Sequence, residues 1–304
     1  MSRLEHSLPG DLGHLNRLIE AWGDEEPESE GAPHPKRQTT QKRRRRLVGV
    51  MAFAGAIDGL RDEDGVPRIA FKGGTALELR FGFRARTSQD LDAVFRGELD
   101  EALSLIEGAL EAGWNGFTGS LGPVEEITRA QLPVNPRRVK IKIRYKSKPF
   151  VTIPFELGIA EGKSLIEPEL AVTVLTLEVL RLPFPENIPL LPVRYQIAQK
   201  LHACTEDDGV SSNERVRDLA DITLLQLLAV SPLDLAGIRE ACLETFDGRG
   251  KHSWPPQIIE QPGWRTLWEA LAQTEDIDET LDEAIARVSA FVKEIDSSPM
   301  VPID

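Results

Sequence analysis

The chain has 304 residues, which is enough for a sizeable core and, judged by the usual length of a domain, suggests two domains. A hydrophobic content of 41% with 28% charged residues is typical of a soluble globular protein. The net charge of -13 argues against a general nucleic-acid-binding protein, because contacts to phosphate groups need a basic surface.

Cysteine use and hydropathy indicate the compartment. The two cysteines, Cys204 and Cys242, cannot build a disulfide framework, so a reducing environment is favoured. The N-terminus lacks the apolar core of a signal peptide, and the longest apolar stretch, 47–57, is too short to span a bilayer. We therefore expect a cytoplasmic protein.

The acidic average hides two strongly basic segments. Residues 36–46 and 137–148 each hold seven basic residues and no acidic one, while the acidic excess lies in segments such as 24–30 and 275–283. An acidic protein with local basic zones can still bind a polyanion at those zones.

Residues 1–46 are predicted to form an N-terminal arm and linker. Apolar residues between Leu12 and Ile19 indicate a short amphipathic helix, and 24–46 is polar and contains three prolines. The apolar spacing then predicts, in chain order, helix 47–60, a short buried strand 69–71, helix 76–81, strand 91–95 and helix 99–112.

A hairpin and a helical region follow. Residues 139–145 and 151–159 alternate strictly and are predicted to pair through a turn at 146–150. Beyond Pro192 the spacing predicts only helices, at 193–204, 214–229, 233–245, 264–273 and 278–294. The predicted fold is therefore α+β, with a mixed α/β unit over 47–185 followed by a helical unit over 186–304.

The stretch 71–95, FKGGTALELRFGFRARTSQDLDAVF, carries the candidate chemistry. Gly73 and Gly74 lack a Cβ atom, so the backbone can approach a phosphate closely, and the helix that follows offers free N–H groups and a positive dipole end. Asp90 and Asp92 lie two residues apart on a predicted strand, so both side chains are on one face. Two carboxylates that close suit Mg²⁺ shared with substrate phosphates, and two such ions can support an in-line displacement.

Glu156 is the only acidic residue inside the predicted strand 151–159. It is predicted to be a third carboxylate of the metal site and an activator of the attacking hydroxyl. Plainer interpretations remain, because a lone Gly-Gly is most often a turn and Asp-x-Asp occurs by chance in many acidic proteins. The ordered combination of strand, glycine turn, helix and strand is much more specific.

Four blocks of sequence stand in a fixed order between about residues 70 and 225: Gly73-Gly74-Thr75-Ala76-Leu77, Arg86-Thr87-Ser88-Gln89-Asp90-Leu91-Asp92, Ile197-Ala198-Gln199-Lys200-Leu201-His202-Ala203 and Arg215-Val216-Arg217-Asp218-Leu219-Ala220-Asp221-Ile222. Together they resemble the AbiEii/MenT-type nucleotidyltransferase toxins of the polymerase-β-like nucleotidyltransferase superfamily. The resemblance implies a polymerase-β-like nucleotidyltransferase domain followed by a helical domain.

The resemblance also implies roles for individual residues. Asp90 and Asp92 would be metal ligands, and Lys200 and Asp218 would be further active-site residues. A lysine ammonium can neutralise a triphosphate as a point charge. The nucleotide would be bound by this lysine together with Gly73, Gly74, Thr75 and Ser88.

Ser88 is in addition a candidate control point, since in some relatives a partner antitoxin phosphorylates a serine at this position. A phosphate there, about -2 in charge, would repel both the NTP and the carboxylates. The chain departs from the family pattern at Gln199, where relatives often carry Glu, and at Glu156, where many of the superfamily use Asp. The basic run 43–46 lies outside the common core.

Plainer interpretations also apply to the later blocks. Lys200 fits an ordinary solvated lysine of an amphipathic helix. Asp218 and Asp221 fit surface charges paired with nearby arginines at helical spacing. His202 fits a surface residue, or one that supports a ligand, better than a metal ligand, and no His or Cys cluster has zinc spacing.

The basic zones allow two interpretations each. The predicted strand places Arg138, Lys140, Lys142 and Arg144 on one face. If it lies in the catalytic sheet near Glu156, this stripe can guide an RNA backbone towards the carboxylates. Otherwise it is the solvated face of an edge strand, where lysines prevent pairing between sheets. The run 43–46 either binds phosphate or is a solvated helix start.

Three functions stay open. The first is the toxin of a toxin–antitoxin pair, which transfers a nucleoside monophosphate from an NTP, with Mg²⁺, to RNA, and the resemblance implies that the acceptor is the 3′ end of tRNA. The second is the same chemistry on a protein side chain, and the third is a catalytically silent module that binds a nucleotide or a partner. Asp90, Asp92, Lys200 and Asp218 together argue against the third, and the stripe favours RNA over protein. The expected partners are an NTP, RNA and a cognate antitoxin, with no membrane.

Overall fold

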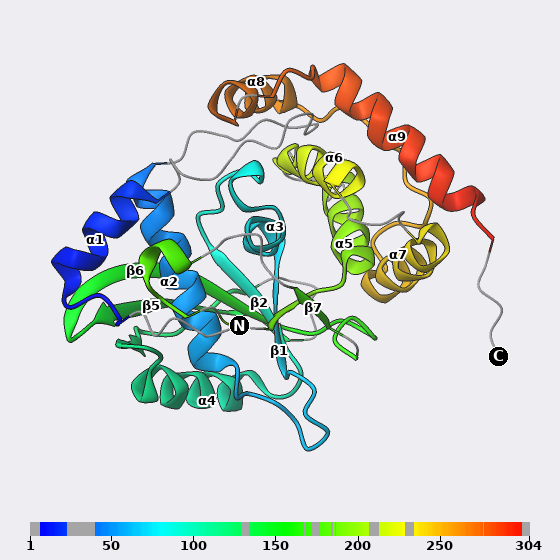
Figure 1. Cartoon of the computed structure of the whole chain (residues 1–304). Helices are drawn as coiled ribbons and strands as arrows, with labels where there is room; N and C mark the ends of the chain where they lie inside the picture. Colours follow the sequence, from blue (N-terminus) through cyan, green and yellow to red (C-terminus); the bar gives the residue numbers. More distant parts are fainter. Residues whose placement is uncertain are drawn as a thin grey trace, which may run out of the picture. The chain divides into compact units, whose positions relative to one another are not determined.

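The structure is a computed structural model of the chain, and its description covers residues 7–22, 40–128, 134–166, 168–171, 177–183, 185, 187–206, 213–228, 234–275 and 277–299. It divides into two compact units, which are described separately (Figure 1). The first comprises Met1–Ala160 and Glu167–Leu190, and the second comprises Glu161–Ile166 and Leu191–Asp304.

A mixed sheet is the frame of the first unit. Its strands are β1 (Ile69–Lys72), β2 (Leu91–Phe95), β3 (Phe117–Leu121), β4 (Glu125–Glu126), β5 (Arg137–Tyr145), β6 (Lys148–Ile159), β7 (Glu169–Ala171) and β8 (Ile188–Leu190). They follow the order β3-β5-β6-β2-β1-β8-β7, and β4 pairs with β5. β2 pairs with β6, and β1 with β8, in parallel, whereas the other pairs are antiparallel.

Helices pack against this sheet. Those described in the first unit are α1 (Leu12–Ala21), α2 (Gln41–Ile57), α3 (Gly73–Phe81) and α4 (Leu99–Ala112), with short 3₁₀ turns at Gly82–Arg84 and Glu178–Leu180. Phe53 of α2 makes edge-to-face ring contacts with Phe71 of β1 (5.9 Å) and Phe155 of β6 (5.4 Å). Gly49 allows α2 to approach β6, because a Cβ atom there would lie 2.5 Å from Val151 Cγ1.

The helix α1 belongs to the core of the first unit. Leu15 and Ile19 have no exposed surface, and Trp22 makes an edge contact with Phe83 at 5.3 Å. The Tyr145 hydroxyl donates to the backbone carbonyl of Pro9 at 2.8 Å. The predicted amphipathic helix is therefore present, but its apolar face makes it part of the unit rather than of a separate arm. The predicted linker lies mostly outside the described residues, and its end, from Gln41, is the first turn of α2.

The predicted hairpin is formed by β5 and β6, with a tighter turn than expected. Lys146 and Ser147 have φ of 46° and 68°, and two consecutive residues with positive φ make the two-residue turn that suits twisted strands. β6 therefore begins at Lys148 instead of Val151. The predicted helix 76–81 likewise begins earlier, at Gly73, because the glycines form its first turn instead of breaking it.

The second unit is helical in the part of the chain that the structure describes. Its helices are α5 (Val193–Thr205), α6 (Arg217–Leu228), α7 (Leu235–Arg249), α8 (Trp264–Glu275) and α9 (Leu281–Ser297). α5 packs against α6 and α7, and α9 begins with a capping box between Thr280 and Glu283. The segment Glu161–Ile166 joins this unit, because Glu161 binds Arg249 at 3.0 Å. The units thus separate at Leu190, a few residues beyond the predicted boundary at 185. Among the described helices, none is long and apolar enough to cross a bilayer.

Candidate active site

A row of four charged residues crosses the sheet of the first unit. Lys72 of β1 is the Cα partner of Asp92 of β2. Asp92 is also the partner of Glu156 of β6, and Glu156 is the partner of Arg138 of β5. Directly paired residues of neighbouring strands project to the same face. The two carboxylates of the row therefore stand side by side, with a basic residue at each end.

The glycine pair at the start of α3 is packed against two of the predicted site residues. Gly73 has φ of +61°, and a Cβ atom there would lie 2.6 Å from Asp92 Oδ2. At Gly74 a Cβ atom would lie 2.8 Å from Ser88 Oγ. Gly73 accepts positive φ readily, and without Cβ atoms the pair leaves room for Asp92 and Ser88 against the helix start. No side-chain hydrogen bond from Lys72 caps this end of α3, which leaves its first N–H groups suited to an anion.

The backbone carbonyl of Asp90 accepts hydrogen bonds from three side chains. The donors are Thr75 Oγ1 at 2.9 Å, Ser88 Oγ at 2.9 Å and Arg46 Nη2 at 2.8 Å. The Asp90 residue itself is exposed. Thr75 and Ser88, both predicted as nucleotide-binding residues, thus fix the backbone from which the Asp90 carboxylate projects.

Two arginines of the basic run 43–46 are buried beneath this loop. Arg43 Nε and Arg46 Nη1 bind the two carboxylate oxygens of Glu78, at 2.9 Å and 2.6 Å. Burial raises the pKa of the Glu78 carboxyl above its ordinary value, against the opposing effect of Arg46 and Arg43. The predictions that the run binds phosphate or is a solvated helix start are wrong for these two residues, because Glu78 of α3 is their partner.

The carboxylates of this face supply the hard oxygen donors that Mg²⁺ prefers. Glu156 Oε2, however, lies 3.3 Å from Arg138 Nη2. Among the residues that the structure describes, no group of three or more His, Cys, Asp and Glu side chains is close enough to hold a metal ion. The predicted set of Asp90, Asp92 and Glu156 is therefore not assembled as a cluster. Mg²⁺ commonly binds one or two carboxylates together with substrate phosphates, and Asp90 and Asp92 beside the glycine pair fit that pattern.

The basic stripe on β5 is exposed, as its alternation predicts. Its members alternate with buried apolar residues and are Arg138, Lys140, Lys142 and Arg144. The alternative interpretation as an edge strand is wrong, because β5 is paired on both sides, with β3 and with β6. Since Arg138 is the partner of Glu156, the stripe shares the face of the sheet that carries the carboxylates.

In the second unit, Lys200 of α5 is buried against two aspartates of α6. Its Nζ lies 2.9 Å from Asp218 Oδ1 and 2.6 Å from Asp221 Oδ2, and none of the three side chains exposes more than 9% of its surface. The interpretation as solvated surface charges is therefore wrong. A buried charge cluster is unfavourable unless its members are paired, and such clusters are candidates for functional sites. Asp221, which lies one helical turn after Asp218, was not among the predicted site residues.

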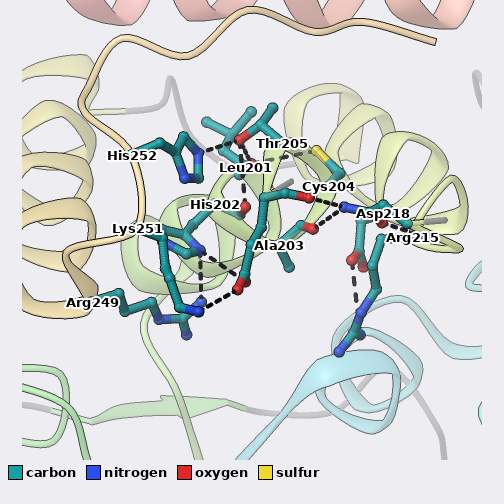
Figure 2. Close-up of polar contacts among 12 residues, drawn as sticks. Leu201, His202, Ala203, Cys204, Thr205, Arg215, Asp218, Arg249, Lys251 and His252 are labelled. Atoms are coloured by element: carbon teal, nitrogen blue, oxygen red, sulfur yellow. Dashed lines mark hydrogen bonds and ion pairs between the residues drawn. The ribbon is translucent and has the colours of Figure 1, made fainter. Parts of the chain in front are cut away.

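Figure 2 shows Asp218 of this cluster together with residues at the C-terminal end of α5. His202 is fully buried, and its ring packs against Phe246 at 4.9 Å and His252 at 4.6 Å. Its Nδ1 lies 3.3 Å from Arg249 Nη1, and its Nε2 has no hydrogen-bond partner among the described residues. His202 is thus a packing residue between α5 and α7 and not a surface residue.

His202 makes stability depend on pH. Burial, followed by the positive charges of Arg249, His252 and Lys251, lowers the pKa of His202 to about 3. An unfolded histidine titrates near ~6.5, so between these values the unfolded state binds more protons and the free energy of unfolding falls as the pH drops. This loss of free energy of unfolding is on the order of 2–3 kcal/mol by pH 4, and we expect His202→Gln to abolish it. Urea unfolding curves recorded between pH 7 and 4 measure the effect. His14→Gln, at a half-exposed histidine of the first unit, is the control, and parallel pH profiles for wild type and H202Q would contradict the prediction.

The fold and the site of the first unit define a class of protein. In the mixed sheet Asp92 lies on β2, Asp90 directly precedes that strand, and Asp92 is packed against a helix that starts with Gly-Gly, an arrangement suited to holding a phosphate chain with a metal ion. Residues 57–288, more than half of the chain, match the family described as the nucleotidyl transferase AbiEii toxin of the type IV toxin–antitoxin system. The chain belongs to this family. A comparison with curated proteins finds no match.

Several solved structures are distantly similar. The MenT4 nucleotidyltransferase toxin from Mycobacterium tuberculosis H37Rv is 14% identical, with 93% of this chain and 97% of that chain covered and a TM-score of 0.47. An antigenic nucleotidyltransferase-like protein from Paracoccidioides brasiliensis is 15% identical, with 81% and 92% covered and a TM-score of 0.38. ANT(2″)-Ia in complex with adenylyl-2″-tobramycin is 14% identical, with 67% and 97% covered and a TM-score of 0.36. Membership of the family comes from the sequence match and not from these similarities.

Proposed function

We propose that the protein transfers a nucleoside monophosphate from an NTP to RNA with the help of Mg²⁺, and that the 3′ end of tRNA is its acceptor. It would act in the cytoplasm as the toxin of a toxin–antitoxin pair, with a cognate antitoxin as partner. The observation that carries the proposal is the packing of Gly73 and Gly74 against Asp92 and Ser88, next to Asp90. It brings the N–H groups of a helix start and two carboxylates to one place, which suits a phosphate chain with its metal.

The reaction would proceed by an in-line displacement. The oxygen of the acceptor hydroxyl forms a bond to the α-phosphorus of the NTP, the bond from this phosphorus to the β-phosphate oxygen breaks, and pyrophosphate leaves. The proton of the hydroxyl passes to a base, a role that we propose for Glu156 once its carboxylate leaves Arg138. Asp90 and Asp92 would hold Mg²⁺, which would supply neutralisation of negative charge.

The remaining site residues would bind and orient the nucleotide. Gly73, Gly74 and Thr75 form the first turn of α3, where a phosphate can accept backbone N–H bonds. In the second unit we propose that Lys200 binds the triphosphate, because its ammonium is held by Asp218 and Asp221 in one position.

A labelling experiment tests the reaction. The full chain is incubated with Mg²⁺, total tRNA and each α-labelled NTP in turn, beside the Asp92→Ala variant. We expect label in tRNA with one NTP and none with the variant. Label in a protein band instead of RNA would support the second candidate, modification of a protein side chain, and NTP binding without any transfer would support a silent module.

The basic stripe on β5 supports RNA as the acceptor, because it shares the carboxylate face. We expect the double variant Lys140→Glu, Lys142→Glu to lower tRNA labelling at least about tenfold, since contacts to phosphates dominate affinity for nucleic acids. Binding of the NTP alone should not change. The control for net charge is Lys42→Glu with Lys293→Glu, at two exposed lysines of α2 and α9. Equal losses in both double variants would argue against an RNA path along β5.

Ser88 is proposed as a regulatory phosphorylation site. Its hydroxyl donates to the Asp90 carbonyl at 2.9 Å and the residue is buried. A phosphate would break this bond and place about -2 of charge beside the carboxylates. We expect Ser88→Glu to lower kcat/KM at least about 100-fold, and Ser88→Ala to lower it less than about tenfold, the range for one neutral hydrogen bond. Similar losses in the two variants would show that the hydroxyl, and not added charge, is what matters.

A further inference from the structure

Lys72 is the member of the charged row that has no role in the reaction as proposed above. It is the last residue of β1 and directly precedes the glycine pair of α3. Its pairing with Asp92 places it on the face of the sheet that carries Asp92 and Glu156. None of the described residues forms a hydrogen bond or an ion pair with its ammonium, although the residue is half-buried.

The side chain of Lys72 extends across β2 towards β6. Its Nζ lies 3.9 Å from the position that a Cβ atom of Gly158 would take. Gly158 is two residues after Glu156 on β6 and so lies on the same face. Because β2 separates β1 from β6, the ammonium passes over the strand that carries Asp92. The missing side chain at Gly158 leaves open the space in which the ammonium lies.

We propose that Lys72 is a further nucleotide-binding residue, whose ammonium contacts a phosphate of the NTP at the start of α3. The inference rests on the proposed nucleotidyl transfer and adds a residue to its site. A triphosphate at Gly73 and Gly74 would lie beside the Asp92 carboxylate. It therefore needs a positive charge on the side of the sheet, in addition to the N–H groups at the helix start. A lysine ammonium is a compact charge that binds phosphate oxygens through strong hydrogen bonds.

A structural explanation of Lys72 predicts something different. If the lysine only balances the charges of Asp92 and Glu156, its removal lowers stability and leaves nucleotide affinity unchanged. Arg138 already performs this task at the other end of the row, where it binds Glu156 at 3.3 Å. Nucleotide affinity and thermal stability, measured on the same variants, therefore separate the two roles.

The test is the affinity of the full chain for the non-hydrolysable α,β-methylene analogue of each of the four NTPs, measured by calorimetry with Mg²⁺. We expect Lys72→Met to raise Kd by roughly 10- to 100-fold, the range for loss of a hydrogen bond to a charged group. Lys72→Arg should recover part of the loss. Gly158→Leu should also raise Kd. Its side chain would occupy the space in which the ammonium lies, although residue 72 is still lysine.

The matched control is Gly158→Ala, whose methyl group would meet Lys72 Nζ at the ordinary contact distance of 3.9 Å. It should keep Kd within about twofold of wild type. A raised Kd in K72M at an unchanged thermal midpoint supports the inference. Wild-type affinity in K72M overturns it, while leaving the proposed function in place. If the wild-type chain binds none of the four analogues, the nucleotidyl-transfer proposal fails as well. If G158L does not fold, the Kd values of K72M and K72R alone test whether Lys72 binds the nucleotide.

Discussion

Asp92→Asn is expected to lower kcat/KM for nucleotidyl transfer by about 10³-fold or more, the range for loss of a group that acts on the charge of the transition state. Asparagine keeps the size of the side chain, so the close packing against Gly73 remains possible. What is lost is the negative charge that a hard cation requires. Initial rates of label transfer at saturating tRNA, recorded beside the thermal midpoint, measure the effect.

Gly73→Ala provides an independent test of the same geometry. The Cβ atom would lie 2.6 Å from Asp92 Oδ2, and the backbone at φ +61° disfavours alanine, so the carboxylate must move. We expect G73A to lose activity to a similar degree as D92N, although no titratable group has changed. Asp64→Asn, at an exposed carboxylate of the loop before β1, serves as the control and should stay within about twofold of wild type. Full activity in both D92N and G73A would place the chemistry elsewhere.

Local periodicity accounts for what the sequence predicted well in the fold. β2 and α4 have the predicted bounds, because β2 is a short apolar run interrupted only by Asp92 and α4 sustains a period of three to four residues over its whole length. β3, with the sequence FTGSL, was missed, since it has a glycine at its centre and no apolar alternation. The position of α1 was missed for another reason: amphipathicity shows which face is buried, but not against what, and here Tyr145 and Phe83 contact Pro9 and Trp22 on either side of the helix.

The same limit applies to the candidate site. The spacing of Asp90 and Asp92 is local, and so is the glycine pair, which is why both could be found in the sequence. The row from Lys72 to Arg138 depends on the register of four strands, and its central pairing, between Asp92 of β2 and Glu156 of β6, joins strands that are far apart in the chain. Likewise, nothing near Arg46 in the sequence shows that its partner is Glu78, thirty-two residues away. Non-local pairing of this kind needs the tertiary structure.

Glu78→Gln is expected to destabilise the protein by about 3–5 kcal/mol, the range for breaking a buried ion pair by removal of one partner. The variant would leave the guanidinium groups of Arg43 and Arg46 buried without their counter-charge. Urea unfolding with the same slope and a lower midpoint is the expected result. The control is Lys42→Ala, at an exposed position of α2, the helix that carries the two arginines. It should change the free energy of unfolding by less than about 0.5 kcal/mol.

The triple variant Glu78→Met, Arg43→Met, Arg46→Met separates stability from function. Replacing a whole buried ionic group by apolar side chains is often neutral or stabilising, so we expect this variant to regain most of the stability lost in E78Q. We do not expect it to have wild-type activity, because Arg46 Nη2 also donates to the Asp90 carbonyl at 2.8 Å and to Thr75 Oγ1 at 2.9 Å. Label transfer and unfolding are measured on the same preparations. A variant that recovers both would mean that the arginines only stabilise the fold, whereas recovery of stability alone would show that the basic run positions Asp90 for the reaction.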